Sequence, residues 1–406
     1  MKSENVVVIG AGQSGFSVCS KLREQGFEGQ VTLIGEEMHL PYQRPPLSKA
    51  YLLGEIALDG LFFRSDSFYA EADIKVMTGA VVTHIDTKQA LITLEDLRTV
   101  TYDTLVLATG SSPIRLPAAI GGNLAGVFYM RDLADADCLA QSMKTGKRAL
   151  IVGGGYIGLE AAAVAVKCGV QTTLVEASDR ILQRVASAET SDYFRTLHKG
   201  HGVTLHEGVS LQELIGENGQ VTGARLSDGS VISIDFLVAG IGVRPNTELA
   251  EEAGLRTQNG IAVNQFCETS VSNVLAAGDC ASFPHGGGYV RLESVGNAVD
   301  MGEIVAQSIM GSRQPYQAKP WFWSDQYNTK LQIVGMSEGY DEIITRRTDD
   351  TRVSFWYYAK DHLLAVDAMN DPRAYMVAKR LIESGKTADK IAVGDPETNL
   401  KSLLKG

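Results

Sequence analysis

Two glycine-rich turns, each between an apolar run and a helical pattern, constrain this chain more than any other feature. In the first, VVVIGAGQSG places Gly10, Gly12 and Gly15 at GxGxxG spacing, and FSVCSKLREQG continues with helical periodicity. A second strand-like run, VTLIGEE, then places Glu36 at the end of a βαβ unit. Such glycines let the backbone approach a pyrophosphate at a helix N-terminus, and such a carboxylate can accept hydrogen bonds from the ribose hydroxyls of an adenosine.

The same order of strand, turn, helix and strand recurs in the middle of the chain. RALIVGGGYIG supplies a strand followed by Gly153, Gly155 and Gly158, LEAAAVAVKCG supplies the helix, and TTLVEAS ends a strand with Glu176. One GxGxxG motif alone is weak evidence for nucleotide binding, because glycine-rich turns also close ordinary hairpins. Two copies in the full context predict two dinucleotides, most economically a permanently held FAD and a nicotinamide cofactor that binds transiently.

Length and composition narrow the class of protein. A chain of 406 residues suggests two or three domains, and 44% apolar with 21% charged residues is ordinary for a globular protein. The net charge of −11 disfavours nonspecific binding to nucleic acid or to an anionic membrane. No apolar run reaches the length of a membrane span, and MKSENVVVIG lacks the features of a signal peptide, so we expect a cytoplasmic protein.

The cysteines argue against a disulfide framework. None of the five falls in a CxxC or CxxxxC pair, so we expect small buried side chains rather than redox partners. They are Cys19, Cys138, Cys168, Cys267 and Cys280.

Two further segments have the pattern of an apolar strand that ends in small residues. They are YDTLVLATG at 102–110 and VLAAGDCA at 274–281. Asp279, in the second, is either a plain turn residue or a carboxylate placed to accept a hydrogen bond from a ribityl hydroxyl.

The order and spacing of these motifs carry a family resemblance over essentially the whole chain. GAGQSG, RPPLSK, LVLATG, GGGYIGLE, AGIGVRPN, AAGDC and WFWSDQY together resemble the FAD-dependent NADH:ferredoxin reductases of bacterial oxygenase systems, a group similar to glutathione reductase in fold. The resemblance implies an α/β protein with two Rossmann-like dinucleotide-binding domains and a C-terminal α+β domain. The expected ranges are 1–115 with 243–318 for FAD, 116–242 for NAD, and 319–406 for the C-terminal domain.

The sequence itself supports the last boundary. After the proline-bearing linker MGSRQPYQAKP, the pattern changes to antiparallel strands such as VSFWYYAKDHLLAVDAMN, with AKDH as the turn. The helical segment RAYMVAKRLIES follows.

For FAD, the resemblance implies a set of contacts that each have a plainer alternative. Ser14 is otherwise a first-turn residue, Val82 core filling, and Arg44 and Arg131 surface charges. Val295 would begin a helix whose N-terminal N–H groups stabilise negative charge on a reduced flavin. The implied set is Gly10, Gly12, Ser14 and Gly15 at the pyrophosphate, Glu36 on the ribose, Arg44 and Lys49 near the cofactor, Val82 beside the adenine, and Arg131, Asp279 and Val295.

For NADH, the resemblance implies a second set. A carboxylate at Glu176 would repel the additional phosphate of NADPH, although the nearby Arg180 weakens this argument. Tyr156 would cover the vacant nicotinamide pocket or simply pack on the surface, and Trp323 would close over the cofactors or form interface core. The implied set is Gly153, Gly155, Tyr156, Ile157 and Gly158 in the loop, Glu176 on the ribose, and Ile241, Gly242 and Trp323 near the cofactors.

Two residues are expected to act chemically. QRPPLSK at 43–49 places Lys49 after a proline-initiated short helix, and GGGYIGLE places Glu160 on the first turn of its helix. The resemblance implies that both approach the flavin and form an ion pair, which would favour the electron-rich reduced ring. The alternative is two solvated surface charges.

The implied reaction is hydride transfer from NADH to FAD, followed by single-electron transfer to a two-iron ferredoxin that serves an oxygenase. QRPPLSK contains no thiol where disulfide reductases and NADH peroxidases need one. The alternatives are an NADH oxidase or diaphorase and a signalling flavoprotein. We expect a monomer or weak dimer that docks an acidic ferredoxin through a basic face, drawn from Arg64, Arg313, Lys330 and Arg346.

Overall fold

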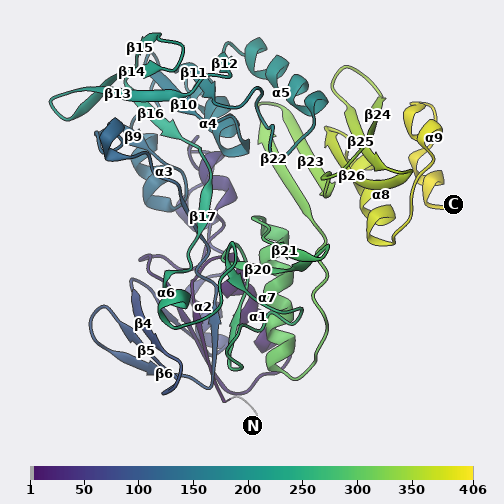
Figure 1. Ribbon diagram of the computed structural model, residues 1–406. Helices are drawn as coiled ribbons and strands as arrows, with labels where there is room; N and C mark the ends of the chain where they lie inside the picture. The colour runs from purple at the N-terminus through teal and green to yellow at the C-terminus, as the bar shows by residue number, and fades with distance from the viewer. Residues whose placement is uncertain (1–3, 406) are drawn as a thin grey trace. The chain divides into compact units, whose positions relative to one another are not determined.

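The computed structural model describes residues 4–405 of the chain, and these form two compact units. Figure 1 shows the course of the chain through them. The first unit holds the described residues up to Gln43 with 58–112 and 244–320, and the second holds 44–57, 113–243 and the residues from Trp321 on. Two short strands contain boundaries between the units, β8 (Ser111–Pro113) and β17 (Val243–Pro245).

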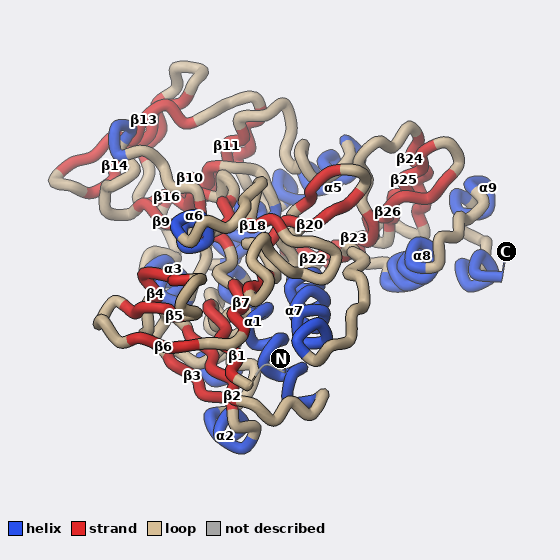
Figure 2. Tube along the Cα trace, turned by 60° about the horizontal axis from the view of Figure 1, so that its bottom comes forward, coloured by secondary structure: helices blue, strands red, loops and turns tan. Residues whose placement is uncertain are grey.

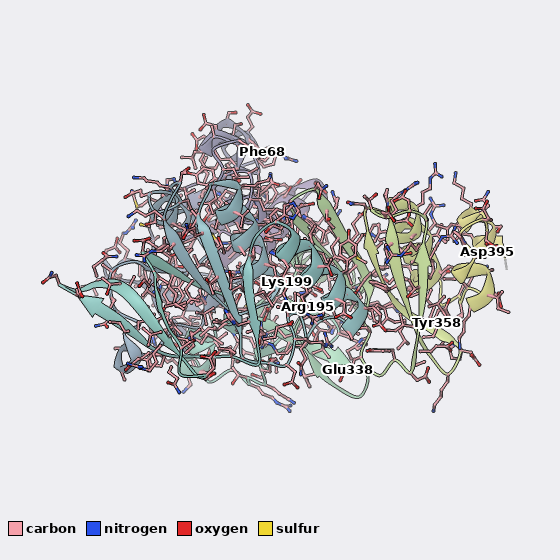
Figure 3. The ribbon with its side chains drawn as sticks, turned by 90° about the horizontal axis from the view of Figure 1, so that it is seen from above. Phe68, Arg195, Lys199, Glu338, Tyr358 and Asp395 are labelled. Atoms are coloured by element: carbon pink, nitrogen blue, oxygen red, sulfur yellow. The ribbon has the colours of Figure 1, made fainter. Side chains whose placement is uncertain are left out.

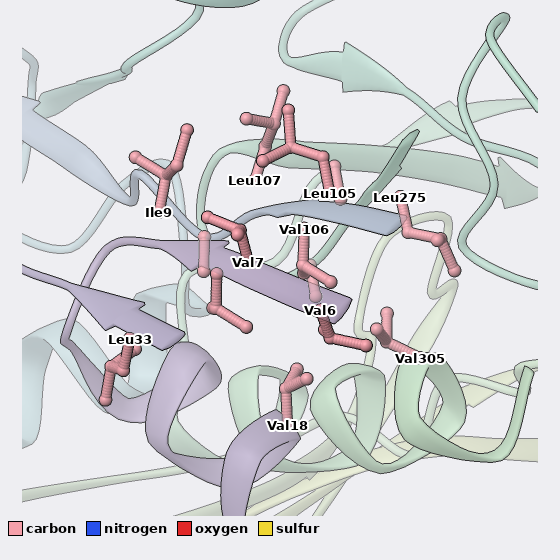
Figure 4. Close-up of a cluster of buried hydrophobic side chains, with 14 of the residues drawn as sticks. Val6, Val7, Ile9, Val18, Leu33, Leu105, Val106, Leu107, Leu275 and Val305 are labelled. Carbon is pink, nitrogen blue, oxygen red and sulfur yellow. The ribbon is translucent and has the colours of Figure 1, made fainter. Parts of the chain in front are cut away.

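The first unit is built on a five-stranded parallel sheet with the order β19-β7-β1-β2-β3. Strands β19, β7, β1 and β2 are nearly continuous buried runs, as expected for a parallel sheet covered on both faces, whereas the edge strand β3 is buried only at its first residue. Figure 4 shows Val18 of α1 and Val305 of α7 beside the strands, with Val6, Val106 and Leu275 among the labelled core side chains. The elements are β1 (Asn5–Ile9), α1 (Gln13–Glu24), β2 (Gln30–Ile34), β3 (Ile74–Met77), β7 (Thr104–Leu107), β19 (Val274–Ala276) and α7 (Val295–Ile309).

Smaller elements complete this unit. An antiparallel sheet β4-β5-β6 and a mixed sheet β18-β20-β21 lie in the same unit as the parallel sheet, and Figure 2 shows the neighbouring strands as a tube. These elements are η2 (Leu58–Gly60), α2 (Asp66–Glu71), β4 (Val82–Asp86), β5 (Leu91–Leu94), β6 (Thr99–Thr101), α6 (Glu248–Glu252), β18 (Ile261–Ala262), β20 (Ala281–His285) and β21 (Gly288–Val290).

The second unit contains another five-stranded parallel sheet, with the order β12-β11-β10-β16-β9, and an antiparallel sheet β13-β14-β15. Its apolar core includes Leu150, Val175 and Leu237, which are almost completely buried. The elements are η1 (Pro45–Ser48), η3 (Ala118–Ile120), β9 (Val127–Phe128), α3 (Leu133–Ala140), β10 (Arg148–Val152), α4 (Tyr156–Lys167), β11 (Gln171–Glu176), α5 (Ala188–Gly200), β12 (Thr204–Glu207), β13 (Leu211–Glu217), β14 (Gln220–Leu226), β15 (Val231–Ser233) and β16 (Phe236–Ala239).

The same unit ends in an antiparallel sheet with the order β22-β23-β26-β25-β24, against which α8 packs. The β25–β26 hairpin turns at Lys360 and Asp361, both at positive φ, as the AKDH segment predicted. The elements are β22 (Trp321–Gln326), β23 (Thr329–Gly335), β24 (Glu342–Arg347), β25 (Val353–Ala359), β26 (His362–Met369), α8 (Pro372–Glu383), α9 (Lys390–Gly394) and η4 (Leu400–Lys405).

The prediction that Arg346 lies on a basic docking surface was wrong. Its side chain is buried at 4% exposure, and its guanidinium donates to the carbonyls of Val393, Asp395, Pro396 and Thr398. Figure 3 labels Asp395 in this closing segment. A guanidinium has five N–H donors, so one arginine can donate to several backbone carbonyls at once. Arg346 thereby holds the C-terminal segment against β24.

Among the described residues, no helix is long and apolar enough to cross a membrane. The α/β class, the two parallel dinucleotide-type sheets and the additional C-terminal domain are confirmed. The three-domain division with boundaries near 115, 242 and 318 stays a prediction.

Candidate functional site

The three glycines of the first glycine-rich turn differ in how closely other protein atoms surround them. Gly10 has φ +110°, and a Cβ added there would lie 2.1 Å from the Ala108 carbonyl oxygen. A Cβ on Gly15 would lie 1.9 Å from the Gly10 carbonyl oxygen, so helix α1 approaches β1 more closely than any side chain permits. A Cβ on Gly12 meets nothing within 4 Å. Two glycines are therefore required by the protein itself, and the third leaves open space at the start of α1.

The second turn repeats this division. Gly153 has φ +104° and packs against the Gly240 carbonyl oxygen, which a Cβ would approach to 2.4 Å. A Cβ on Gly158 would lie 2.0 Å from the Gly153 carbonyl oxygen, whereas one on Gly155 meets nothing within 4 Å. The same backbone arrangement has thus been built twice from unrelated flanking residues.

Both open positions are helix N-caps without a side-chain capping bond, so the first N–H groups of α1 and α4 are left for another acceptor. At the first turn, the buried Ser14 hydroxyl has no hydrogen-bond partner within the described part of the chain. A glycine without contacts, uncapped N–H groups and an unpartnered hydroxyl fit a pyrophosphate well. The residues present therefore fit a dinucleotide at each turn.

Glu176, the last residue of β11, holds the second turn in place. Its Oε2 accepts from the Gly154 N–H at 2.6 Å, and its Oε1 accepts from the Ser178 N–H at 2.7 Å. Arg180, which weakened the argument for NADH, donates to the carbonyls of Ala186 and Ser187. Its guanidinium is therefore engaged by the protein, while the carboxylate of Glu176 lies beside the turn.

Lys49 and Glu160 form an ion pair, with 2.9 Å between Lys49 Nζ and Glu160 Oε2. Lys49 directly follows η1, the short helix that Pro45 and Pro46 begin, and Glu160 is the fifth residue of α4. The expectation that Glu160 lies on the first turn was thus slightly wrong, because α4 begins only at Tyr156. The Glu160 side chain is 5% exposed and that of Lys49 is 18% exposed, so neither is a solvated surface charge.

Two hydroxyls complete the surroundings of the carboxylate. Ser48 Oγ donates to Glu160 Oε2 at 2.8 Å, and Ser324 Oγ, from β22, donates to Glu160 Oε1 at 2.7 Å. Burial raises the pKa of Glu160, and the Lys49 ammonium and the two serine hydroxyls oppose that rise. The site therefore stabilises a carboxylate in a position where desolvation alone would favour the neutral acid.

Comparison with known proteins identifies the class to which this arrangement belongs. The description "Pyridine nucleotide-disulphide oxidoreductase" matches residues 4–302, and "Reductase C-terminal" matches residues 321–404. The chain belongs to the pyridine nucleotide-disulphide oxidoreductase family. The family name refers to a disulfide, but the sequence of this oxidoreductase contains no CxxxxC pair.

Full-length relatives of this oxidoreductase are electron-transfer reductases. It is 39% identical to rhodocoxin reductase from Rhodococcus erythropolis, over 98% of this chain and 94% of the relative. It is 38% identical to putidaredoxin reductase from Pseudomonas putida, over 99% and 97% of the two chains. The solved covalent complex of putidaredoxin reductase with putidaredoxin matches at a TM-score of 0.95 and 37% identity, over 99% of this chain and 98% of that one.

The other residues implied for the first cofactor lie in both units of the oxidoreductase. In the first unit, Val82 is buried, Glu36 is exposed just after β2, Asp279 Oδ2 accepts from Ser111 Oγ at 3.0 Å, and Val295 begins α7 as expected. In the second unit, Arg44 Nη1 donates to the Arg131 carbonyl at 2.8 Å. Their contacts with a cofactor stay predictions.

The residues implied for the nicotinamide cofactor all belong to the second unit. Ile157 is exposed on the first turn of α4, and the Gly242 carbonyl accepts from the Ile114 N–H, one residue beyond Ile241. Trp323 stacks on Trp321 with ring centroids 5.4 Å apart. Their roles at the cofactor also stay predictions.

Tyr156 is half-buried, and whether it covers the nicotinamide pocket stays a prediction. Its ring packs against Phe322 of β22 with centroids 4.7 Å apart, and its hydroxyl is buried without a hydrogen-bond partner in the described residues. Burial raises the pKa of the Tyr156 hydroxyl well above its usual value, with smaller contributions from Asp367 and Tyr357. Tyr156 therefore links the start of α4 to the C-terminal sheet.

Asp367, a buried residue that the sequence did not single out, lies in the C-terminal sheet next to α5. Its Oδ2 accepts from the hydroxyls of Tyr357 and Thr190, at 2.5 and 2.7 Å. Burial raises the pKa of Asp367 from 3.8 to about 6. No local motif indicates a buried carboxyl group at this position. The signal in the sequence is a single acidic residue inside the apolar run HLLAVDAM.

Replacing Asp367 with asparagine should stabilise the protein above about pH 6. The raised pKa means that the folded protein binds an additional proton between about pH 4 and pH 6, so this carboxyl makes the free energy of unfolding fall as the pH rises through that window. The isosteric amide should remove this dependence and recover about 1–2 kcal/mol at pH 7. Urea unfolding at several pH values measures it; an unchanged pH profile would contradict the assignment.

Proposed function

We propose that the protein is an NADH-dependent ferredoxin reductase that serves an oxygenase, with a two-iron ferredoxin as its electron acceptor. One observation carries the proposal: in a chain with two dinucleotide-type turns, the half-buried Lys49 pairs with the buried Glu160, which also accepts from two serine hydroxyls. The printed names and the full-length coverage of the relatives support it. A thiol that would accept an electron pair is absent from QRPPLSK, so the flavin is left as the redox group.

In this proposal the first turn holds FAD and the second holds NADH. Bound FAD supplies the conversion of a two-electron hydride into single electrons. The N-terminal N–H groups of α1 and α4 bind the two pyrophosphates, and Gly12 and Gly155 allow the close approach. Glu176 disfavours the 2′-phosphate of NADPH, and the engagement of Arg180 by backbone carbonyls strengthens that preference.

Lys49 and Glu160 are the proposed catalytic residues. The ammonium of Lys49 would stabilise negative charge on the reduced ring, and Glu160 orients this ammonium at 2.9 Å. Docking of an acidic ferredoxin would then use exposed basic residues, of which Arg64, Arg313 and Lys330 remain candidates. The cytoplasmic location, the three-domain division and the state as a monomer or weak dimer remain part of the proposal.

Electron transfer to cytochrome c should depend on an added ferredoxin. The purified flavoprotein, supplied with NADH, should reduce cytochrome c slowly alone and at least about tenfold faster with a two-iron ferredoxin present. Ferricyanide reduction, which needs no docking, controls for intact hydride transfer. Rapid turnover with oxygen or a quinone and no response to any of several ferredoxins would favour an NADH oxidase or diaphorase instead.

A further inference from the structure

Five polar side chains form a continuous hydrogen-bonded chain that ends on the carboxylate of Glu160. Ser324 Oγ lies 2.7 Å from Glu160 Oε1, and Gln326 Nε2 lies 3.0 Å from Ser324 Oγ. His198 Nε2 lies 2.7 Å from Gln326 Oε1, and Tyr327 Oη lies 3.2 Å from His198 Nδ1. The chain therefore runs from the loop after β22, through α5 and β22, to α4.

The middle of this chain is completely buried. Ser324, Gln326 and His198 all have 0% exposure, so each polar atom must find its partner within the protein. Burial lowers the pKa of His198 to about 4, with a smaller contribution from the nearby His201. The imidazole is therefore neutral at pH 7, with one nitrogen that donates and one that accepts.

The ionised carboxylate fixes the direction of every bond. Because the Glu160 carboxylate can only accept, Ser324 must donate to it, and the Ser324 oxygen accepts from the Gln326 amide nitrogen. The Gln326 oxygen then faces His198, which must carry its proton on Nε2. Nδ1 is left to accept from the Tyr327 hydroxyl. All four donors thus point toward Glu160, and a protonated Glu160 would allow the reverse order.

We propose that Gln326 and His198 are positioning residues that keep Glu160 ionised and directed at Lys49. Aligned hydrogen bonds polarise one another, so the aligned chain favours the anion over the neutral acid at this buried position. The groups that face the carboxylate from the neighbouring elements are Lys49, Ser48 and Ser324, and His201 stacks on Tyr327 with ring centroids 3.7 Å apart. The expected effect of Gln326 and His198 on flavin reduction rests on the proposed function. The direction of the hydrogen bonds along the chain does not.

Gln326→Met cuts the chain while keeping the length of the side chain. Ser324 then loses the donor that orients it, and the protonation of Glu160 should move to higher pH. In single-turnover reduction of the bound flavin by NADH without ferredoxin, we expect a rate several-fold below wild type near pH 6 and within about twofold of wild type near pH 8.5.

Tyr193→Phe is the matched control. Its hydroxyl lies 3.4 Å from Thr329 Oγ1, so the variant also loses a hydrogen bond between α5 and the C-terminal sheet, but one that is not connected to Glu160. We expect its pH profile to coincide with wild type. An equal fall at all pH values in Gln326→Met, or the same shift in Tyr193→Phe, would overturn the proposal.

Nitrogen-15 NMR of the imidazoles tests the proton arrangement without turnover. His198 should carry its proton on Nε2 and stay in that form down to about pH 5, since its pKa is lowered to about 4. Tyr327→Phe removes only the last donor, and we expect His198 to keep its proton on Nε2 opposite the Gln326 oxygen, with a smaller shift of the same sign in the pH profile. A wild-type Nδ1–H tautomer would refute the proposed direction, whether or not the protein reduces a ferredoxin.

Discussion

Replacing Gly158 with alanine should lower kcat/KM for NADH by about a hundredfold while leaving the flavin bound. The added Cβ would lie 2.0 Å from the Gly153 carbonyl oxygen, and a backbone atom at this distance cannot rotate away. The start of α4 must therefore move outward, which misplaces the N–H groups that would receive the pyrophosphate. Ferricyanide-coupled kinetics measures the effect, and the flavin absorbance of the purified protein reports whether the cofactor is retained.

Gly155→Ala is the informative control because its Cβ meets no protein atom within 4 Å. This variant should unfold at the same urea concentration as wild type, yet raise KM for NADH about tenfold because the methyl group occupies the space proposed for the pyrophosphate. Wild-type kcat/KM for NADH in Gly158→Ala, or wild-type KM in Gly155→Ala, would show that the turn does not bind the cofactor as proposed.

Replacing Lys49 with methionine should destabilise the folded protein by about 3–5 kcal/mol near pH 8. The substitution leaves Glu160 with 4% exposure and no counter-ion, so the pKa of its carboxyl must rise further. A carboxyl group whose folded pKa is raised makes the protein less stable as the pH rises, so the defect should shrink as the pH is lowered from about 8 to about 5 and the carboxyl takes up a proton. Urea unfolding of the holoprotein at the two pH values measures this.

The double variant Lys49→Met with Glu160→Gln separates charge from packing. The amide needs no counter-ion, so the double variant should regain most of the stability while flavin reduction by NADH stays slow. Lys144→Met, at an exposed position, serves as the control for losing a lysine. A single Lys49 variant that is as stable as this control at pH 8 would mean that Glu160 is neutral in the wild-type protein.

The sequence predicted the parts of the site that are set by local geometry. GxGxxG spacing after a buried strand requires the same close approach of helix and strand wherever it occurs, which is why both turns could be expected before the structure. The contact between Lys49 and Glu160 could also be expected, but only through the family resemblance, because the two residues are 111 positions apart in the sequence.

The groups that support the pair could not be predicted in the same way. Ser324 and His198 reach Glu160 and Gln326 through pairings between distant segments, and a lone serine or histidine has no sequence signature. One signal was present: in WFWSDQ, Ser324 and Gln326 alternate with partly exposed residues, as two polar side chains on the buried face of a strand would. The prediction for Arg346 was wrong because an isolated arginine is normally exposed at the surface, whereas this one is buried.

The position of Ser324 and Gln326 on β22 limits how freely the C-terminal sheet can be exchanged between relatives. A hybrid that took residues 321–404 from another reductase would replace both side chains, together with Tyr327. The hydrogen-bonded chain to Glu160 would then be broken, unless the donor segment carries the same three side chains and meets a histidine at position 198. The C-terminal sheet and the surroundings of Glu160 are thus inherited as one block in this architecture.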